Sequence, residues 1–182
     1  MKRLLHSVFL ILLLAGSNLS CTEDLDFTQF DDLEATPTYE AGILYLETTE
    51  ELINLISGTN VFSQNFNFDA FSSDVFAERV LDGTITFVVE NTTSKEIELI
   101  VEFLDEGNTV TDREVFLIQP APSAIIRREI AYGDTGRSID IIRTLTTIRV
   151  TATNLGDNTS VSNLPNPLIT LQSSGRFRVR LK

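Results

Sequence analysis

Four cations alternate with apolar residues near the end of this 182-residue chain, and such a spacing could bind anions. The cations, which we call the arginine row, are Arg176, Arg178, Arg180 and Lys182. Because successive side chains of a β-strand point to opposite faces, a strand here would carry every cation on one face. These donors could hold phosphate or carboxylate groups of lipopolysaccharide, of an acidic glycan or of the acidic N-terminal segment. We favour a simpler interpretation, a solvated cationic face that blocks edge-to-edge pairing of strands.

Few other residues could carry out chemistry. The single His is His6 and the single Cys is Cys21, and both lie near the N-terminus. If the first is removed with a signal peptide and the second is lipidated, the mature chain has no Ser-His-Asp or Cys-His catalysis. It also has none of the usual zinc, copper or haem ligand sets, and the sequence contains no glycine-rich phosphate-binding motif. The sequence therefore predicts no cofactor.

Carboxylates remain as candidates for hydrolysis or for calcium binding. Asp31, Asp32 and Glu34 could supply the acid and base of a glycosidase, but they lie in an expected tether where no wall would raise one pKa. The acidic residues Asp24 and Asp26 lack the D-x-D-x-D-G spacing of a calcium loop. We interpret these carboxylates as surface charge, and a carboxylate-dependent hydrolase and a bound calcium ion stay open as alternatives.

The composition is acidic. The chain has 14 Lys and Arg against 26 Asp and Glu, a net charge of −12, and no cation lies between Arg3 and Arg79. This charge argues against nucleic acid as a partner. The hydrophobic fraction of 42% is enough for one domain with a core, and a single Cys excludes an internal disulfide framework.

The first twenty residues have the order of a secretory signal peptide. Lys2 and Arg3 precede the apolar block 8–14, and the small residues 15–17 follow it. The apolar stretch is shorter than the roughly 20 residues that a membrane-spanning helix needs. We therefore predict a signal peptide over residues 1–20.

The residues that end this segment, Asn18-Leu19-Ser20-Cys21, resemble the lipobox of bacterial lipoproteins. In that family the signal is cut before a Cys that carries the lipid. Ser20 fits the small residue required before the cut, whereas Asn18 stands where the family usually has Leu. The resemblance implies that Cys21 is lipidated and anchors the chain to a membrane. Cleavage after residues 15–17, which would leave Cys21 as a free thiol, is the alternative.

An acidic run follows Cys21. It resembles the signal that some bacteria use to send lipoproteins to the outer face of the outer membrane, and it consists of Glu23, Asp24 and Asp26. The resemblance implies a lipid-anchored outer-membrane protein at the cell surface, with the periplasmic face as the alternative. A solvated, self-repelling tether over residues 21–38 explains the same charges equally well.

Period-two alternation predicts strands over most of the remaining chain. The expected strands are 40–46, 64–70, 84–90, 96–104, 114–119, 124–131, 147–153, 168–171 and 176–181. A capping box of Thr48 and Glu51 predicts a short helix over 48–58, and one or two helical turns are expected over 138–145. Arg127 and Arg128 share a strand and point to opposite faces, so only one of them could extend the arginine row.

Short strands at spacings of roughly 10 residues, joined by turns, predict an all-β fold. We expect residues 39–182 to form an immunoglobulin-like antiparallel β-sandwich with one or two short helices and a core rich in Phe. For function, we favour a lipid-anchored, non-enzymatic envelope protein whose sandwich is an interaction or structural module for an envelope partner. The alternatives are an adhesin or glycan-binding subunit, which would use loops at one end or the arginine row, and the hydrolase.

Overall fold

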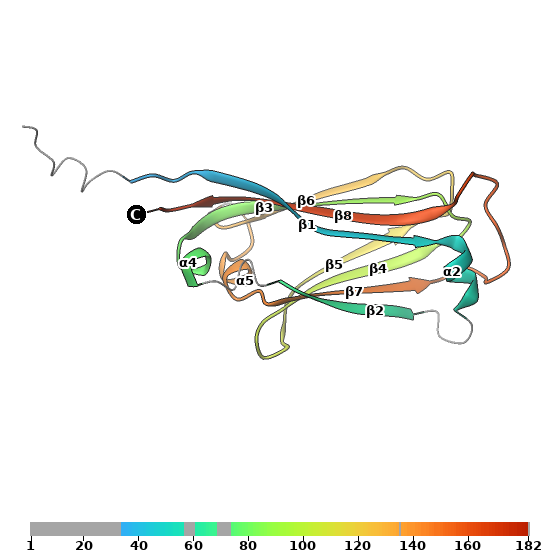
Figure 1. Cartoon of the computed structure of the whole chain (residues 1–182), viewed down its shortest axis with the longest axis horizontal. Coiled ribbons are helices and arrows are strands. Elements are labelled where there is room, and N and C mark those ends of the chain that lie inside the picture. Colours follow the sequence, from blue (N-terminus) through green and yellow to red (C-terminus); the bar gives the residue numbers. More distant parts are fainter. Residues whose placement is uncertain (1–33, 57–60, 69–73, 135, 182) are drawn as a thin grey trace, which may run out of the picture. The chain divides into compact units, whose positions relative to one another are not determined.

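The computed structural model describes residues 34–56, 61–68, 74–134 and 136–181. They form two four-stranded sheets with the orders β1-β8-β3-β6 and β2-β7-β4-β5 (Figure 1). The strands are β1 (Thr38–Thr49), β2 (Val61–Asn67), β3 (Val80–Asn91), β4 (Ile97–Leu104), β5 (Val110–Ile118), β6 (Ile126–Tyr132), β7 (Thr147–Asn154) and β8 (Leu168–Val179). The helices are α2 (Glu50–Leu55), α4 (Asp74–Ala77) and α5 (Asp140–Arg143). All strand pairs are antiparallel, so the predicted antiparallel β-sandwich is confirmed.

The strand order specifies the sandwich further. Consecutive strands lie in opposite sheets except in the β4–β5 hairpin, and the first strand pairs with the last. This is the order of a jelly roll, an eight-stranded sandwich built from two Greek keys. It differs from the immunoglobulin order, in which the first two strands are neighbours in one sheet. Here α2 stands between the first two strands in sequence, and β2 belongs to the second sheet.

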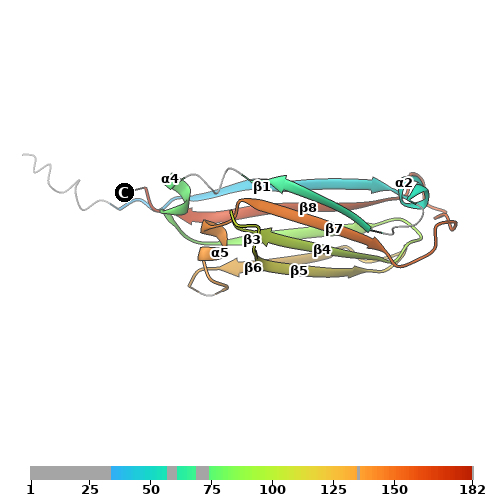
Figure 2. The same ribbon diagram turned by 90° about the horizontal axis from the view of Figure 1, so that it is seen from below.

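The core lies between the two sheets (Figure 2). The inward-facing residues of β4 are Ile97, Leu99, Val101 and Phe103, as their alternation predicts. Among the described residues four Phe side chains are buried, namely Phe87, Phe103, Phe116 and Phe177, and the other buried apolar side chains are mainly Ile and Val. Each such side chain contributes roughly 1.5–3 kcal/mol when it leaves water. Phe62 is an exception among the described Phe residues, because its side chain stays 43% exposed.

One long strand, β8, replaces the two short strands expected near the C-terminus. The segment Gln172–Gly175 looks like a turn because it is rich in Ser and Gly, yet it pairs with β1 on one side and β3 on the other. The ring of Phe177 explains the glycines. A Cβ atom on Gly175, or on Gly83 across from Phe177 on β3, would overlap this ring. Gly175 therefore leaves room for the buried ring of Phe177 and does not mark a turn.

The helix α2 begins one residue later than the predicted capping box requires. Thr48 still belongs to β1, where it pairs with Ile169 of β8. The N-cap is Thr49, whose hydroxyl oxygen accepts a hydrogen bond from the backbone N–H of Leu52 at 3.3 Å. The capping box of Thr48 and Glu51 was therefore wrong, because sheet pairing extends β1 by several residues beyond the predicted strand.

A group of charged side chains joins the edge strands β5 and β6, and we call it the β5–β6 clamp. Arg137 donates hydrogen bonds to Asp112 at 2.7 Å and to Glu114 at 2.5 Å. The Tyr132 hydroxyl donates to Asp112 at 2.7 Å, and Arg128 donates to Glu114 at 2.6 Å. Burial, followed by the hydrogen bond to Asp112, raises the pKa of Tyr132. The clamp closes this side of the sandwich because each carboxylate of β5 binds one side chain of β6 and also Arg137 of the loop that follows β6.

Replacement of Arg137 by Ala should lower the free energy of unfolding by about 1–3 kcal/mol. The two carboxylates are largely buried and would lose a shared cation, although partial exposure of Arg137 reduces the cost. Urea-induced unfolding measures the change. Arg127→Ala is the control, because the Arg127–Glu129 pair is exposed and should contribute less than about 1 kcal/mol. Equal losses in the two variants would contradict a stabilising role of the clamp.

Candidate functional site

The arginine row lies on the outer face of the first sheet, as its spacing predicts. Arg176 and Arg178 belong to β8, whose inward residues Phe177 and Val179 are buried. Arg178 Nε donates to Asp82 at 2.9 Å, and Arg180 Nε lies 2.5 Å from a carboxylate oxygen of Glu34. The hydrogen bond to Asp82 raises the pKa of Arg178. Two cations of the row are therefore already paired with carboxylates.

Arg176 differs from these two cations. It forms no ion pair with any residue that the structure describes, and Glu40 of β1 and Thr84 of β3 lie opposite it. It lines a shallow polar depression of about 410 Å³ together with Arg178. Two acidic residues, Asp82 and Asp134, line the same depression, so its charge is mixed. Lys182, the last predicted member of the row, lies outside the described residues.

Of the two arginines on β6, one shares the outer face with the row. The inward position of Ile130 places Arg128 inward and Arg127 outward, which confirms that only one could join. Arg127 is aligned with Gln172, four residues from Arg176, and it binds Glu129 at 2.6 Å. The row therefore gains no continuous extension from β6.

The other predicted site residues are mostly outside the structure. Cys21, the acidic run behind it, and the hydrolase candidates Asp31 and Asp32 lie outside the described residues. Glu34 is described, and it is the exposed partner of Arg180. In the described part of the chain no three residues among His, Cys, Asp and Glu are placed to hold a metal ion.

A second polar cluster lies at the end of the sandwich formed by α2 and residues 155–167, which we call the loop end. Glu50, the first residue of α2, is buried. Its carboxylate accepts hydrogen bonds from the backbone N–H of Ser94 at 2.6 Å, from the Ser94 hydroxyl at 2.5 Å and from the N–H of Ser162 at 2.8 Å. Burial alone would raise the pKa of Glu50, but these hydrogen bonds and the nearby charge of Lys95 lower it below its usual value.

Lys95 is the second member of this cluster, and its side chain is completely buried. Its Nζ donates to Asp157 Oδ1 at 3.0 Å and to the carbonyl oxygen of Ser160 at 2.7 Å. The same carbonyl accepts a hydrogen bond from Asn54 Nδ2 of α2 at 3.2 Å. A buried ammonium group requires such partners, because its transfer from water costs several kcal/mol. Lys95 therefore ties the loop before β4 to the loop before β8.

Asp157 holds the fold of the loop around Lys95. Its carboxylate accepts hydrogen bonds from the Ser160 hydroxyl at 2.5 Å, from the Ser160 N–H at 2.6 Å and from the Thr159 N–H at 2.8 Å. These contacts, with the Ser160 hydroxyl first, lower the pKa of Asp157. We call Glu50, Lys95 and Asp157 the buried charge cluster after its two buried members, Glu50 and Lys95; the Asp157 side chain is 55% exposed. The hydrogen bonds stabilise the charged forms of the two carboxylates, and this suits a rigid scaffold.

Asn91, the last residue of β3, also holds the loop that contains Lys95. Its buried amide nitrogen donates to the carbonyl oxygens of Lys95 at 2.7 Å and Gln119 at 2.9 Å. Its amide oxygen accepts from the N–H of Thr93 at 2.9 Å. The sequence predicted a turn here but missed the buried lysine. The available signal was that Lys95 is the one cation within an otherwise polar, uncharged turn.

Several apolar side chains of the loop end are exposed. They are Leu52 and Leu55 of α2, and Leu155, Val161 and Leu164 of the following loop. Leu55 and Val161 are 69% and 68% exposed, and they line a groove of about 520 Å³ with Pro167 and Asn166. Exposed apolar groups that share one surface groove, as Leu55 and Val161 do, are typical of protein interaction sites. Sequence alternation missed them because long-range contacts bring α2 and the loop together.

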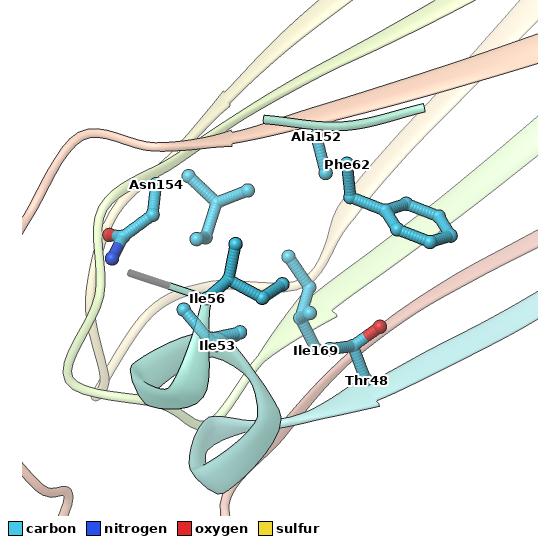
Figure 3. Close-up of a pocket in the computed structure, with 8 residues that line it drawn as sticks. Thr48, Ile53, Ile56, Phe62, Ala152, Asn154 and Ile169 are labelled. Carbon is cyan, nitrogen blue, oxygen red and sulfur yellow. The ribbon is translucent and has the colours of Figure 1, made fainter. Parts of the chain in front are cut away.

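The inner side of α2 covers a small apolar cavity (Figure 3). In this view Ile53 and Ile56 point into the same space as Phe62, Ala152 and Ile169. The cavity volume is about 120 Å³, below the roughly 300 Å³ at which pockets for small-molecule ligands begin. The apolar lining therefore packs α2 on the sandwich.

Comparisons with known proteins identify no family for this chain. No protein-family model matches it, and no curated protein sequence matches it. Among solved structures, it is similar to a pilus subunit of Bacillus endospore appendages, with 10% identity, 79% of this chain and 90% of that chain covered, and a TM-score of 0.37. It is also similar to a nora virus protein, with 12% identity, 82% of this chain and 60% of that chain covered, and a TM-score of 0.41. A turnip yellow mosaic virus protein has 9% identity, with 82% of each chain covered and a TM-score of 0.35. The strand order, and not these matches, establishes the sandwich.

Acid should lower the unfolding free energy that the buried charge cluster contributes, and the variant Lys95→Met measures the part that depends on Lys95. Glu50 and Asp157 have lowered pKa values in the folded chain, so their stabilisation is complete above their unfolded pKa of about 4. It is lost as the pH falls through their folded pKa values. At neutral pH, Lys95→Met should cost about 1–3 kcal/mol of unfolding free energy, because the hydrogen bonds of the buried ammonium group disappear.

Urea unfolding of wild type and Lys95→Met at neutral pH and at about pH 3 measures how the difference in their unfolding free energies depends on pH. Both proteins should be less stable at about pH 3, because the unfolded chain then binds protons that the folded Asp157, with its lowered pKa, does not. The gap between wild type and Lys95→Met should persist at this pH, since Asp157 keeps its charge in the folded chain. A gap that disappears at about pH 3 would contradict the assignment.

Proposed function

We propose that this chain is a lipid-anchored protein of the bacterial cell envelope whose sandwich binds an envelope protein partner through the loop end. The observation that carries the proposal is the group of exposed apolar side chains on a scaffold fixed by buried hydrogen bonds. Such an arrangement lowers the entropy lost on binding, because the contact surface is already ordered. The groove lined by Leu55 and Val161, and also by Glu51 and Asn54, offers a concave contact for a side chain of the partner.

The anchor part of the proposal is supported by sequence. A basic start, an apolar block and Cys21 after a small residue form a pattern similar to bacterial lipoproteins. Acyl chains on Cys21 would add about 0.8 kcal/mol of membrane affinity for each buried CH₂ group, so several chains hold the protein durably. No helix among the described residues has the length and apolar character needed to cross a membrane.

The direction of β1 bears on where the lipid anchor and the loop end lie along the sandwich. This strand begins at Thr38, near the end of the sandwich that carries α4 and α5, and it ends beside α2 (Figures 1 and 2). Twelve residues of strand span roughly 40 Å. A chain anchored before Thr38 thus enters the sandwich at one end and displays the loop end at the other, where a partner has access.

The two alternatives receive less support. A glycan-binding or anion-binding role of the arginine row stays a prediction, and the carboxylates beside Arg178 and Arg180 would compete with an acidic ligand. A carboxylate-dependent hydrolase also stays a prediction. The neighbouring carboxylates Asp112 and Glu114 both bind Arg137, so each already accepts a hydrogen bond from this cation.

Replacement of Cys21 by Ser should abolish the lipid anchor. Cells grown with a labelled fatty acid should label the wild-type chain, and the variant should carry no label and should leave the membrane fraction. The physical reason is that the Ser hydroxyl cannot form the thioether that holds the acyl chains. Label that persists in the variant would contradict the anchor.

Aspartate at Leu55 and Val161 should abolish partner binding through the loop end. A photo-crosslinking residue placed at Leu164 in the full chain should give one discrete cross-linked product in intact cells. The double variant should reduce that product at least about tenfold, because two charges would be buried against an apolar contact. Both positions are exposed, so the fold should persist, and circular dichroism checks this.

The matched control is Leu117→Asp, which introduces a charge at an exposed apolar residue on the second sheet, away from the loop end. This variant should leave the cross-linked product unchanged. A product that is equally strong in the loop-end variant, or equally weak in the control, would contradict the proposed site.

A further inference from the structure

The two sheets have four edge strands, and three of them carry charges. The edges are β1 and β6 in the first sheet and β2 and β5 in the second. An exposed edge presents unpaired backbone N–H and C=O groups to any other strand, and proteins usually protect it with charges, Pro residues or bulges. The charges are Glu40 and Glu47 on β1; Asp112, Arg113 and Glu114 on β5; and Arg127, Arg128 and Glu129 on β6.

The strand β2 has none of these protections. Its sequence, Val61–Asn67, contains no charged residue and no Pro, and it pairs with β7 without a bulge. On the opposite side of the sandwich the β5–β6 clamp links the two edge strands. Beside β2, in contrast, Phe62 is 43% exposed and Gln64 is exposed, although both face the same way as core residues. Among the residues that the structure describes, the edge of β2 therefore pairs with no further strand, and it is partly apolar.

The sequence of β2 is nearly symmetric about Gln64. Reading outward in both directions gives Ser63 and Asn65, and then Phe62 and Phe66. Phe62, Gln64 and Phe66 share the inward face, because they lie opposite Ala152, Val150 and Ile148 of β7. A two-fold axis through Gln64 would therefore match this strand with an antiparallel copy of itself, apolar residue against apolar residue.

We propose that β2 pairs with β2 of a second copy of this chain, antiparallel and with Gln64 opposite Gln64 of the other copy. Phe62 then lies opposite Phe66 of the other copy, and this occurs twice, once on each side of the axis. Aromatic pairs of this kind stabilise antiparallel strands. The two central Gln side chains, each with an amide donor and an acceptor, bind each other and fix the register.

The choice of a second copy as the occupant rests on charge. The chain carries a net charge of −12, so most contacts between two copies bring like charges together. The β2 edge is neutral, and the self-pairing register places no charge opposite another. The added strand also covers the crevice between β1 and β2 that is lined by Leu46, Phe62 and Gln64. Pairing would join the two second sheets into one continuous eight-stranded sheet.

Charge variants of Gln64 test the pairing. Full-length chains with two different affinity tags are produced together, solubilised in detergent and purified through one tag. Wild-type copies should co-purify. Two Gln64→Lys copies should co-purify at least about tenfold less, because two like charges would face each other at the axis. A mixture of Gln64→Lys and Gln64→Glu copies should recover the association.

The control is Gln172→Lys, the same change at an exposed Gln of β8, which is not an edge strand. It should leave co-purification at the wild-type level. As a second measurement, Gln64→Cys should form a disulfide-linked dimer on mild oxidation with diamide, because opposed Cα atoms in antiparallel strands lie at a distance that suits a disulfide. Neither the wild type, which has Cys21, nor Gln172→Cys should form this product.

Three results would overturn the proposal. The first is co-purification of two Gln64→Lys copies at the wild-type level. The second is a mixed pair of opposite charges that associates no better than the Lys pair. The third is cross-linking of Gln64→Cys to a different protein in place of a second copy, which would show that the β2 edge takes a heterologous strand.

Discussion

The buried ammonium group of Lys95 is the interaction on which the loop end depends. It is held by Asp157 and by the carbonyl oxygen of Ser160, and the neighbouring carboxylate of Glu50 binds N–H groups of the same two loops, those of Ser94 and Ser162. Removal of a charge from water costs several kcal/mol, so this cluster is stable only when all its partners are in place. Such a cluster favours one arrangement of α2 and of residues 155–167, because any other arrangement leaves a buried charge without its partner.

The jelly-roll strand order explains why this cluster lies where it does. The loops that connect β1 to β2, β3 to β4 and β7 to β8 meet at one end of the sandwich (Figure 1). Each loop contributes one member of the cluster, Glu50, Lys95 or Asp157. The two long sides of the sandwich differ as well. The β5–β6 side is closed by hydrogen-bonded charges, whereas β2 on the other side carries no charge and, in the described part of the chain, no strand beyond it.

The alternation of apolar residues was enough to predict the sandwich and most of its strands. It predicted the inward face of β4 and the outward face of the arginine row, because both depend only on local spacing. It did not predict that β8 is one strand, since Gly175 serves a close approach to Phe177 that no local pattern reveals. It also missed α4 and the jelly-roll order. The order depends on which strands meet across the sheets, and single-strand periodicity contains no information on that. The buried charge cluster was missed for the same reason, because its three members are far apart in sequence.

Hydrogen exchange of individual backbone amides tests the central claim most directly. The amides of Ser94, Thr159, Ser160 and Ser162 donate to the carboxylates of Glu50 and Asp157. If the buried charge cluster fixes the loop end, these loop amides should exchange slowly, at rates close to those of the central strands, and Lys95→Met should accelerate them selectively. Fast exchange of these amides in the wild-type chain, at the rate of exposed loops, would contradict the claim that the loop end is a rigid surface.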